Sequence, residues 1–154
     1  ERQARSVAYY HAWYGDPGGR DLEMAYKSLK WNAEQILGVQ VIERAEIVVS
    51  AQPVYGSTDF HHRTVYIRQD SSVNHKFFVL AHELGHVLQP KTLTDHAQME
   101  VFAEAVSSLI AGLYGTRNVN SAPYIASYKA GIGILRDLRH EIHIASQTAA
   151  VGRQ

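Results

Sequence analysis

The chain has 154 residues, of which 45% are hydrophobic and 19% charged, and its formal net charge at pH 7 is zero with neutral histidines. These values are typical of one folded globular domain and exclude a disordered chain. A net charge of zero gives no overall basic surface for nucleic acid. The absence of cysteine excludes disulfides and thiolate metal sites.

The N-terminal part predicts two helices. An aromatic-rich segment predicts a helix over residues 2–14, and the sequence Asp-Pro-Gly-Gly at 16–19 ends it. A second helix is expected over residues 21–37, with Asp21 as its N-cap and Gly38 at the C′ position.

Two strands are expected next. Residues 39–51 are rich in valine and isoleucine, which favours a strand. The turn-forming residues Pro53, Gly56 and Ser57 predict a turn after it. Residues 62–68 alternate between apolar and polar, as in a half-buried strand. We expect His61 and His62, at the start of this strand, to be solvated.

The central feature is a His-Glu-x-x-His pattern formed by His82, Glu83 and His86, inside a mostly apolar helix expected over residues 74–88. Positions i and i+4 share one face of a helix, so both histidines can reach one metal ion. Glu83 points away from that face and can touch a metal-bound water instead. Glycine at position 85 costs about 1 kcal/mol relative to alanine inside a helix, and the close approach of another backbone or of a ligand would explain its presence.

This division of roles is that of a zinc hydrolase. Neutral imidazoles hold zinc, an open coordination position holds water, and a carboxylate takes the water's proton. We therefore predict a zinc site with His82 and His86 as ligands and Glu83 as the catalytic base.

Catalytic zinc usually has a third protein ligand, which is expected from the next helix. This helix is predicted over residues 95–114, with Gly115 at its C′ position. Glu100 and Glu104 lie on one face of that helix. We prefer Glu100 as the ligand and Glu104 as the group that orients a ligand histidine, with Glu104 as the alternative ligand. Asp95, the expected N-cap, and His96 are less suited to the role.

The C-terminal part predicts one last helix from Ser121 to Ala150, loosened at Gly131 and Gly133. The pair His140 and His143 within it lacks the spacing of the first motif, so we interpret it as a solvated helix face.

The stretch over residues 65–150 resembles the zincin-like metallopeptidase domain of ArdC-type antirestriction proteins and of phage or plasmid polyvalent proteins. The similar pieces are Ala-His-Glu-Leu-Gly-His at 81–86, Met-Glu-Val-Phe-Ala-Glu-Ala at 99–105, Ser-Ala-Pro-Tyr-Ile-Ala-Ser-Tyr at 121–128 and the alanine-rich end at 144–150. The ImmA/IrrE peptidases are a near relative. The resemblance implies a zinc site from His82, His86 and a glutamate of the third helix, with Glu83 as base, and a mobile-element setting.

We therefore expect a single α+β, zincin-like domain over residues 1–154, with a small antiparallel or mixed sheet packed on the motif helix and further helices. The expected activity is that of a cytoplasmic zinc metallopeptidase acting on a peptide or protein. Nucleic acid is not indicated by this chain, and no apolar run approaches the ~20 residues that cross a membrane. The alternative is a non-proteolytic antirestriction or binding module that retains the metal site.

Overall fold

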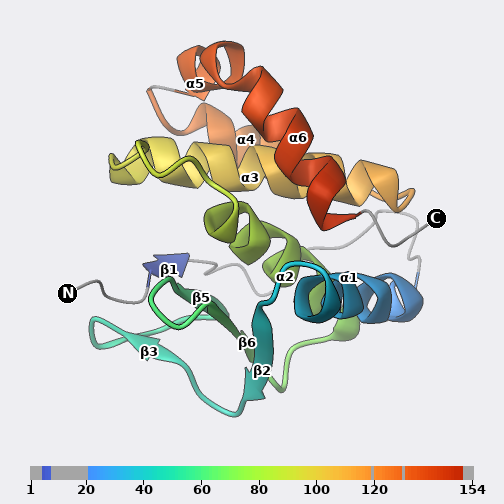
Figure 1. Ribbon diagram of the computed structural model, residues 1–154. Helices are drawn as coiled ribbons and strands as arrows, with labels where there is room; N and C mark the ends of the chain where they lie inside the picture. The colour runs from blue at the N-terminus through green and yellow to red at the C-terminus, as the bar shows by residue number, and fades with distance from the viewer. Residues whose placement is uncertain (1–4, 8–20, 119, 130, 151–154) are drawn as a thin grey trace.

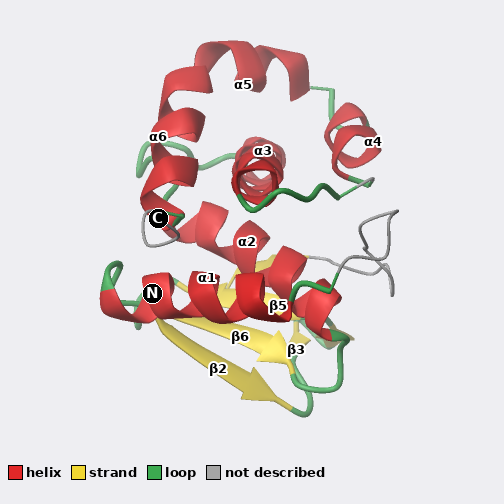
Figure 2. Ribbon diagram, turned by 90° about the vertical axis from the view of Figure 1, so that its right-hand side faces the viewer, coloured by secondary structure: helices red, strands yellow, loops and turns green. Residues whose placement is uncertain are grey.

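Four of the described strands form a small mixed sheet, and the helices pack above it (Figures 1 and 2). The computed structural model describes residues 5–7, 21–118, 120–129 and 131–150. The strands of these residues are β1 (Arg5–Val7), β2 (Gln40–Arg44), β3 (Val48–Val49), β4 (Gln52–Pro53), β5 (Gly56–Asp59) and β6 (Thr64–Arg68). Their helices are α1 (Glu23–Gln35), α2 (Val73–Val87), α3 (His96–Leu113), α4 (Ser121–Ala126), α5 (Gly131–Asp137) and α6 (Arg139–Ala149).

The main sheet has the strand order β1-β5-β6-β2. β2 runs parallel to β6, whereas β5 is antiparallel to both β6 and β1. β3 and β4 form a separate antiparallel pair. The N-terminal strand β1 thus covers the edge of β5.

Helix α2 is the central element of the fold. Figure 1 shows it between the sheet and α3, with α1 beside it, while α4, α5 and α6 lie around α3 (Figure 2). The architecture is therefore α+β with a small mixed sheet packed on the motif helix, which confirms the predicted fold class.

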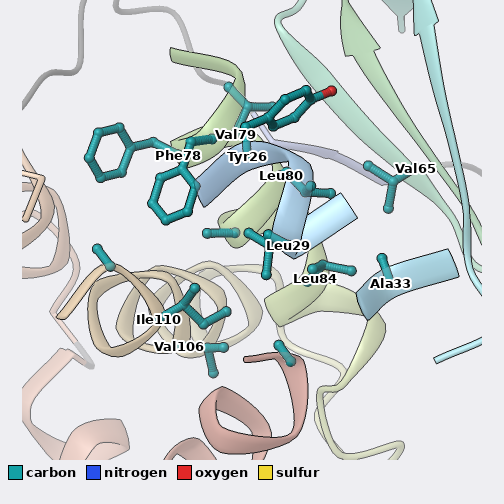
Figure 3. Packing of buried hydrophobic residues seen from close by; sticks show 14 of the residues in the cluster. Tyr26, Leu29, Ala33, Val65, Phe78, Val79, Leu80, Leu84, Val106 and Ile110 are labelled. Atoms are coloured by element: carbon teal, nitrogen blue, oxygen red, sulfur yellow. The ribbon is translucent and has the colours of Figure 1, made fainter. Parts of the chain in front are cut away.

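The hydrophobic core lies where α1, α2 and α3 meet. Its side chains include Leu29 from α1, Phe78 and Leu84 from α2, and Val106 and Ile110 from α3, all completely buried (Figure 3). Each completely buried side chain of this size contributes about 1.5–3 kcal/mol to folding. The core thereby fixes the orientation of α2 against α3, on which the polar residues between them depend.

Several predicted helix boundaries are confirmed. α2 begins one residue before the expected start, with the Ser72 side chain accepting a hydrogen bond from the His75 amide. Asp95 caps α3 by accepting from the Gln98 amide. Gly115 follows α3 with a φ of 78°, which glycine adopts without strain.

The predicted N-terminal helix is wrong where the structure describes it. Arg5–Val7 form strand β1, because their backbone pairs with β5. Residues 2–4 and 8–14 of that predicted helix, and its expected end at 16–19, lie outside the described residues.

The turn predicted around residues 53–57 is also wrong. Gln52–Pro53 form β4, and Gly56 begins β5. Gly56 lies against α2, where an added Cβ would come within 2.3 Å of a methyl group of Val79. The glycine therefore permits close packing of the strand on the helix instead of marking a turn.

The single C-terminal helix that we predicted is divided into α4, α5 and α6. At the start of α5, a Cβ on Gly131 would lie 2.7 Å from the carbonyl oxygen of Ile125. This close approach needs glycine, and the direction change lets α6 pack back on α3. His140 and His143 are exposed on α6, as predicted.

Among the described residues, none of the helices combines the length and apolarity that crossing a membrane requires.

Gly85→Ala should destabilise the fold. A Cβ at Gly85 would lie 2.7 Å from the Cα and 2.8 Å from the carbonyl oxygen of Ala103. These are backbone atoms, which cannot rotate away from the added methyl group as a side chain could. We expect the free energy of unfolding, measured by urea denaturation, to fall by about 1–3 kcal/mol. Gly112→Ala is the matched control, since nothing lies within 4 Å of its added Cβ. An equal effect of both substitutions would contradict the packing.

His75 should make the fold acid-sensitive. Burial, followed by the charge of Arg68, lowers the pKa of His75 from 6.5 to about 4, so the unfolded chain takes up a proton first as pH falls. Relative to His75→Phe, which has no titrating ring, wild type should lose on the order of 2–3 kcal/mol between about pH 6.5 and pH 4. Denaturation of both proteins across this range measures the difference, and a constant difference would contradict the assignment.

Candidate metal centre

Helix α2 carries three of the predicted site residues on its buried surface. His82, Glu83 and His86 are completely buried, because α2 has the sheet on one side and α3 on the other. The spacing of four residues brings the two imidazole rings together, with centroids 5.0 Å apart. Both imidazole rings therefore face helix α3.

Glu100 on helix α3 lies opposite the two histidines. Its Oε1 lies 3.3 Å from Nε2 of His82, and its Oε2 lies 3.1 Å from Nε2 of His86. One ligand atom from each of the three residues lies within 4.8 Å of the others. Nε2 of His86 is buried and makes no hydrogen bond with the described residues. Two imidazoles and a carboxylate that converge in this way fit a divalent metal ion.

Glu104 lies behind His82, on the side away from the Nε2 atoms. Its Oε1 is 2.6 Å from Nδ1 of His82, and its Oε2 accepts a hydrogen bond of 2.5 Å from the Ser121 hydroxyl. Nδ1 of His86 similarly lies 3.1 Å from Oε1 of Gln89. Such contacts hold the rings so that their Nε2 atoms face the metal position.

Glu83 approaches from the sheet side of α2. Its Oε1 accepts a hydrogen bond from the Thr58 hydroxyl on β5, whereas its buried Oε2 has no hydrogen-bond partner among the described residues. Burial raises the pKa of Glu83 to about 7, against the lowering effect of His86 and His82. A carboxylate with one free oxygen and a pKa near neutrality is suited to accept a proton from water.

The electrostatics of the cluster favour a positive charge between its carboxylates. Burial lowers the pKa of His82, but the contacts with the carboxylates of Glu100 and Glu104 outweigh this effect and raise the pKa to about 10. Burial likewise raises the pKa of Glu100, but the charge of His86 and the close contacts with both histidines hold it well below its usual range. Positive charge is therefore stabilised between the two carboxylates.

Four polar residues of the centre were missed by sequence reasoning. Thr58, Gln89 and Ser121 are described above, and the Tyr124 hydroxyl on α4 donates to Oε1 of Glu100 at 3.0 Å. Burial, and then the charge of Glu100, raise the pKa of Tyr124, so this hydroxyl stays protonated as a donor. The resemblance in the stretch at 121–128 was the available signal for Ser121 and Tyr124, but it assigned them no role.

The structure thus brings together His82, His86 and Glu100, and it places Glu104 and Glu83 at the edge of this group. The disfavoured alternatives, Asp95 and His96, are exposed at the start of α3, and the cluster of described residues does not include them. The roles of ligand, orienting group and base stay predictions.

Metal affinity should separate the two glutamates. Glu100→Gln removes a charged ligand oxygen and should weaken Zn²⁺ binding by more than 100-fold, whereas Glu104→Gln keeps an acceptor for His82 and should cost roughly 10- to 100-fold or less. Competition with a chelating dye measures both, and Glu141→Gln, on the exposed face of α6, is the control. The reverse order would make Glu104 the ligand.

Comparison with known proteins points the same way as this geometry. The family described as Peptidase_M78, IrrE N-terminal-like domain, matches residues 35–111, which are half of the chain and run from the end of α1 through most of α3. No curated protein and no solved structure matches the chain significantly. The matched segment contains His82, Glu83, His86, Glu100 and Glu104. The chain belongs to the M78 peptidase family of IrrE N-terminal-like domains.

Proposed function

We propose that this protein is a zinc-dependent peptidase that hydrolyses peptide bonds in a peptide or protein substrate. The observation that carries the proposal is the buried group of His82, His86 and Glu100, with the free Oε2 of Glu83 beside it. Membership in a peptidase family supports the same reading.

Zinc fits this donor set better than magnesium or calcium does. Two imidazoles and one carboxylate are the protein ligands of one known class of catalytic zinc site, whereas magnesium and calcium prefer oxygen ligands alone. When bound, zinc would supply an acidified water and polarise the carbonyl group of the scissile bond. Glu104 and Gln89 would keep the two imidazoles turned toward it.

Glu83 would move the proton. Its free Oε2 takes a proton from the attacking water and then delivers it to the nitrogen of the leaving amine. The hydrogen bond from Thr58 to Oε1 fixes the carboxylate, so the same oxygen remains available for both transfers. A pKa of about 7 suits an oxygen that must both accept and release the proton near neutral pH.

Tyr124 would position the carboxylate of Glu100 and would take no part in the proton transfers. Its hydroxyl donates to Oε1 of Glu100, which limits the orientations of that carboxylate. The narrower resemblance to ArdC-type antirestriction proteins, with its mobile-element setting, stays a prediction.

Glu83→Gln tests the proposal. The amide keeps the size of the side chain but cannot serve as a base, so we expect hydrolysis to fall by about 10²–10⁴-fold while bound zinc and thermal stability stay unchanged. The measurement is digestion of a peptide library by both proteins at matched zinc content, with Glu141→Gln as the control.

One outcome would contradict the role of Glu83, and another would contradict the peptidase function itself. Equal cleavage by wild type and Glu83→Gln would remove Glu83 from the mechanism. If wild type cleaves no peptide, while a protein or DNA partner binds equally well to both forms, the protein is instead a non-proteolytic binding module that retains a metal site.

A further inference from the structure

A cavity of about 540 Å³ lies beside the candidate metal centre, a size typical of ligand pockets. One wall is the turn between β5 and β6, and the other is the end of α2 with the connection to α3. Its lining residues are Phe60, His61, Arg63, His86, Val87, Gln89, Pro90, Lys91, Leu93, Thr94 and Met99. The cavity thus reaches His86 itself, whose ring lies nearly perpendicular to the ring of Phe60, with centroids 6.4 Å apart.

The ionisable groups that line this cavity are all basic. Apart from His86, they are His61, Arg63 and Lys91, and no aspartate or glutamate is among the lining residues. The three side chains belong to exposed residues, and apolar lining residues such as Leu93 and Met99 lie with them. This local excess of positive charge contrasts with the zero net charge of the chain.

No carboxylate of the described residues neutralises Arg63 or Lys91. The Arg63 guanidinium donates to the carbonyl oxygen of Leu37, which leaves further N–H groups and its full charge. The acids nearest in sequence are engaged elsewhere. Asp59 pairs with His62, and Asp95 caps α3.

The backbone at Arg63 is itself unusual. Arg63 has a φ of 49°, a left-handed conformation that glycine and asparagine adopt more readily. Arg63 thus occupies a position at which glycine or asparagine would reduce the backbone strain. Such strain is often retained where the side chain has a function.

An extended peptide places successive side chains on opposite sides. If its scissile bond lies at the metal position, a side chain next to that bond can enter a cavity that begins at His86. The occupant should be apolar along its stem and negatively charged at its tip. Glutamate and aspartate have this chemistry, and Arg63 can bind a carboxylate with two parallel hydrogen bonds.

We propose that Arg63 and Lys91 determine substrate specificity, so that the protein selects peptides with an acidic side chain next to the scissile bond. This inference rests on the proposed peptidase function and names the substrate class for the same site. Neither residue takes part in the bond-breaking step.

Digestion of a random peptide library tests the specificity. In wild type we expect glutamate and aspartate to be enriched about tenfold over glutamine and asparagine at one position beside the cleaved bond. In the double variant Arg63→Glu, Lys91→Glu, the enrichment should vanish, and lysine and arginine should replace the acids at that position. Arg63→Asn, which suits the backbone conformation, tests the loss of one charge without strain.

Arg139→Glu is the matched control, because this exposed residue of α6 does not line the cavity. It should leave the acidic preference unchanged. Cleavage of all peptides without regard to charge would overturn the specificity and leave the peptidase function intact. An acidic preference that survives both charge reversals would also overturn it.

A binding measurement separates the two proposals if no peptide is cleaved. The same library is passed over immobilised, zinc-loaded wild type and over the double variant, and the bound peptides are sequenced. Acid enrichment on wild type alone would support the inference although the hydrolysis had failed. Retention of peptides without any preference for charge would overturn the inference. It would also be overturned if acidic peptides were not retained and the protein instead bound single-stranded DNA through Lys91.

Discussion

The contact between Gly85 and Ala103 is the constraint on which the centre depends. At this point α2 and α3 approach so closely that a single added methyl group would collide with backbone atoms. One residue before the contact on α2 is Leu84 of the core, and one residue after it is His86. On α3, Ala103 lies between Glu100 and Glu104. Because the glycine lets the helices meet, the carboxylates of one reach the imidazoles of the other.

Burial makes these contacts obligatory. Three carboxylates and two imidazoles lie in a space from which solvent is nearly excluded, where an unpaired charge is very costly. The different surroundings of these carboxyl groups give them different pKa values. The pKa of Glu100 is held low by the histidines, whereas that of Glu83 is raised to about 7. Groups of one chemical type are thereby suited to different tasks, one to hold a cation and one to exchange a proton.

Local patterns predicted the parts of the fold that local physics determines. The helical spacing of His82 and His86, the N-cap at Asp95 and the glycine after α3 all depend on residues within one or two turns. The approach of Glu100 was inferable because a third ligand was needed and its helix was apolar. Thr58 and Ser121 were not inferable. Their contacts depend on how β5 and α4 pack against helices far away in sequence, and the pattern of residues does not encode that packing.

The misassigned strand β5 shows why sequence rules fail beside the centre. Gly56 and Ser57 are weak strand formers, and by propensity alone they favour a turn. A larger side chain at Gly56 would collide with Val79 and come close to Glu83, and this would push β5 away from α2. Thr58 could then no longer hold Glu83 by its hydroxyl. The strand therefore contains residues that weaken it locally, because its position against α2 matters more than its own stability. Pairing with β6 on one side and β1 on the other compensates for that weakness.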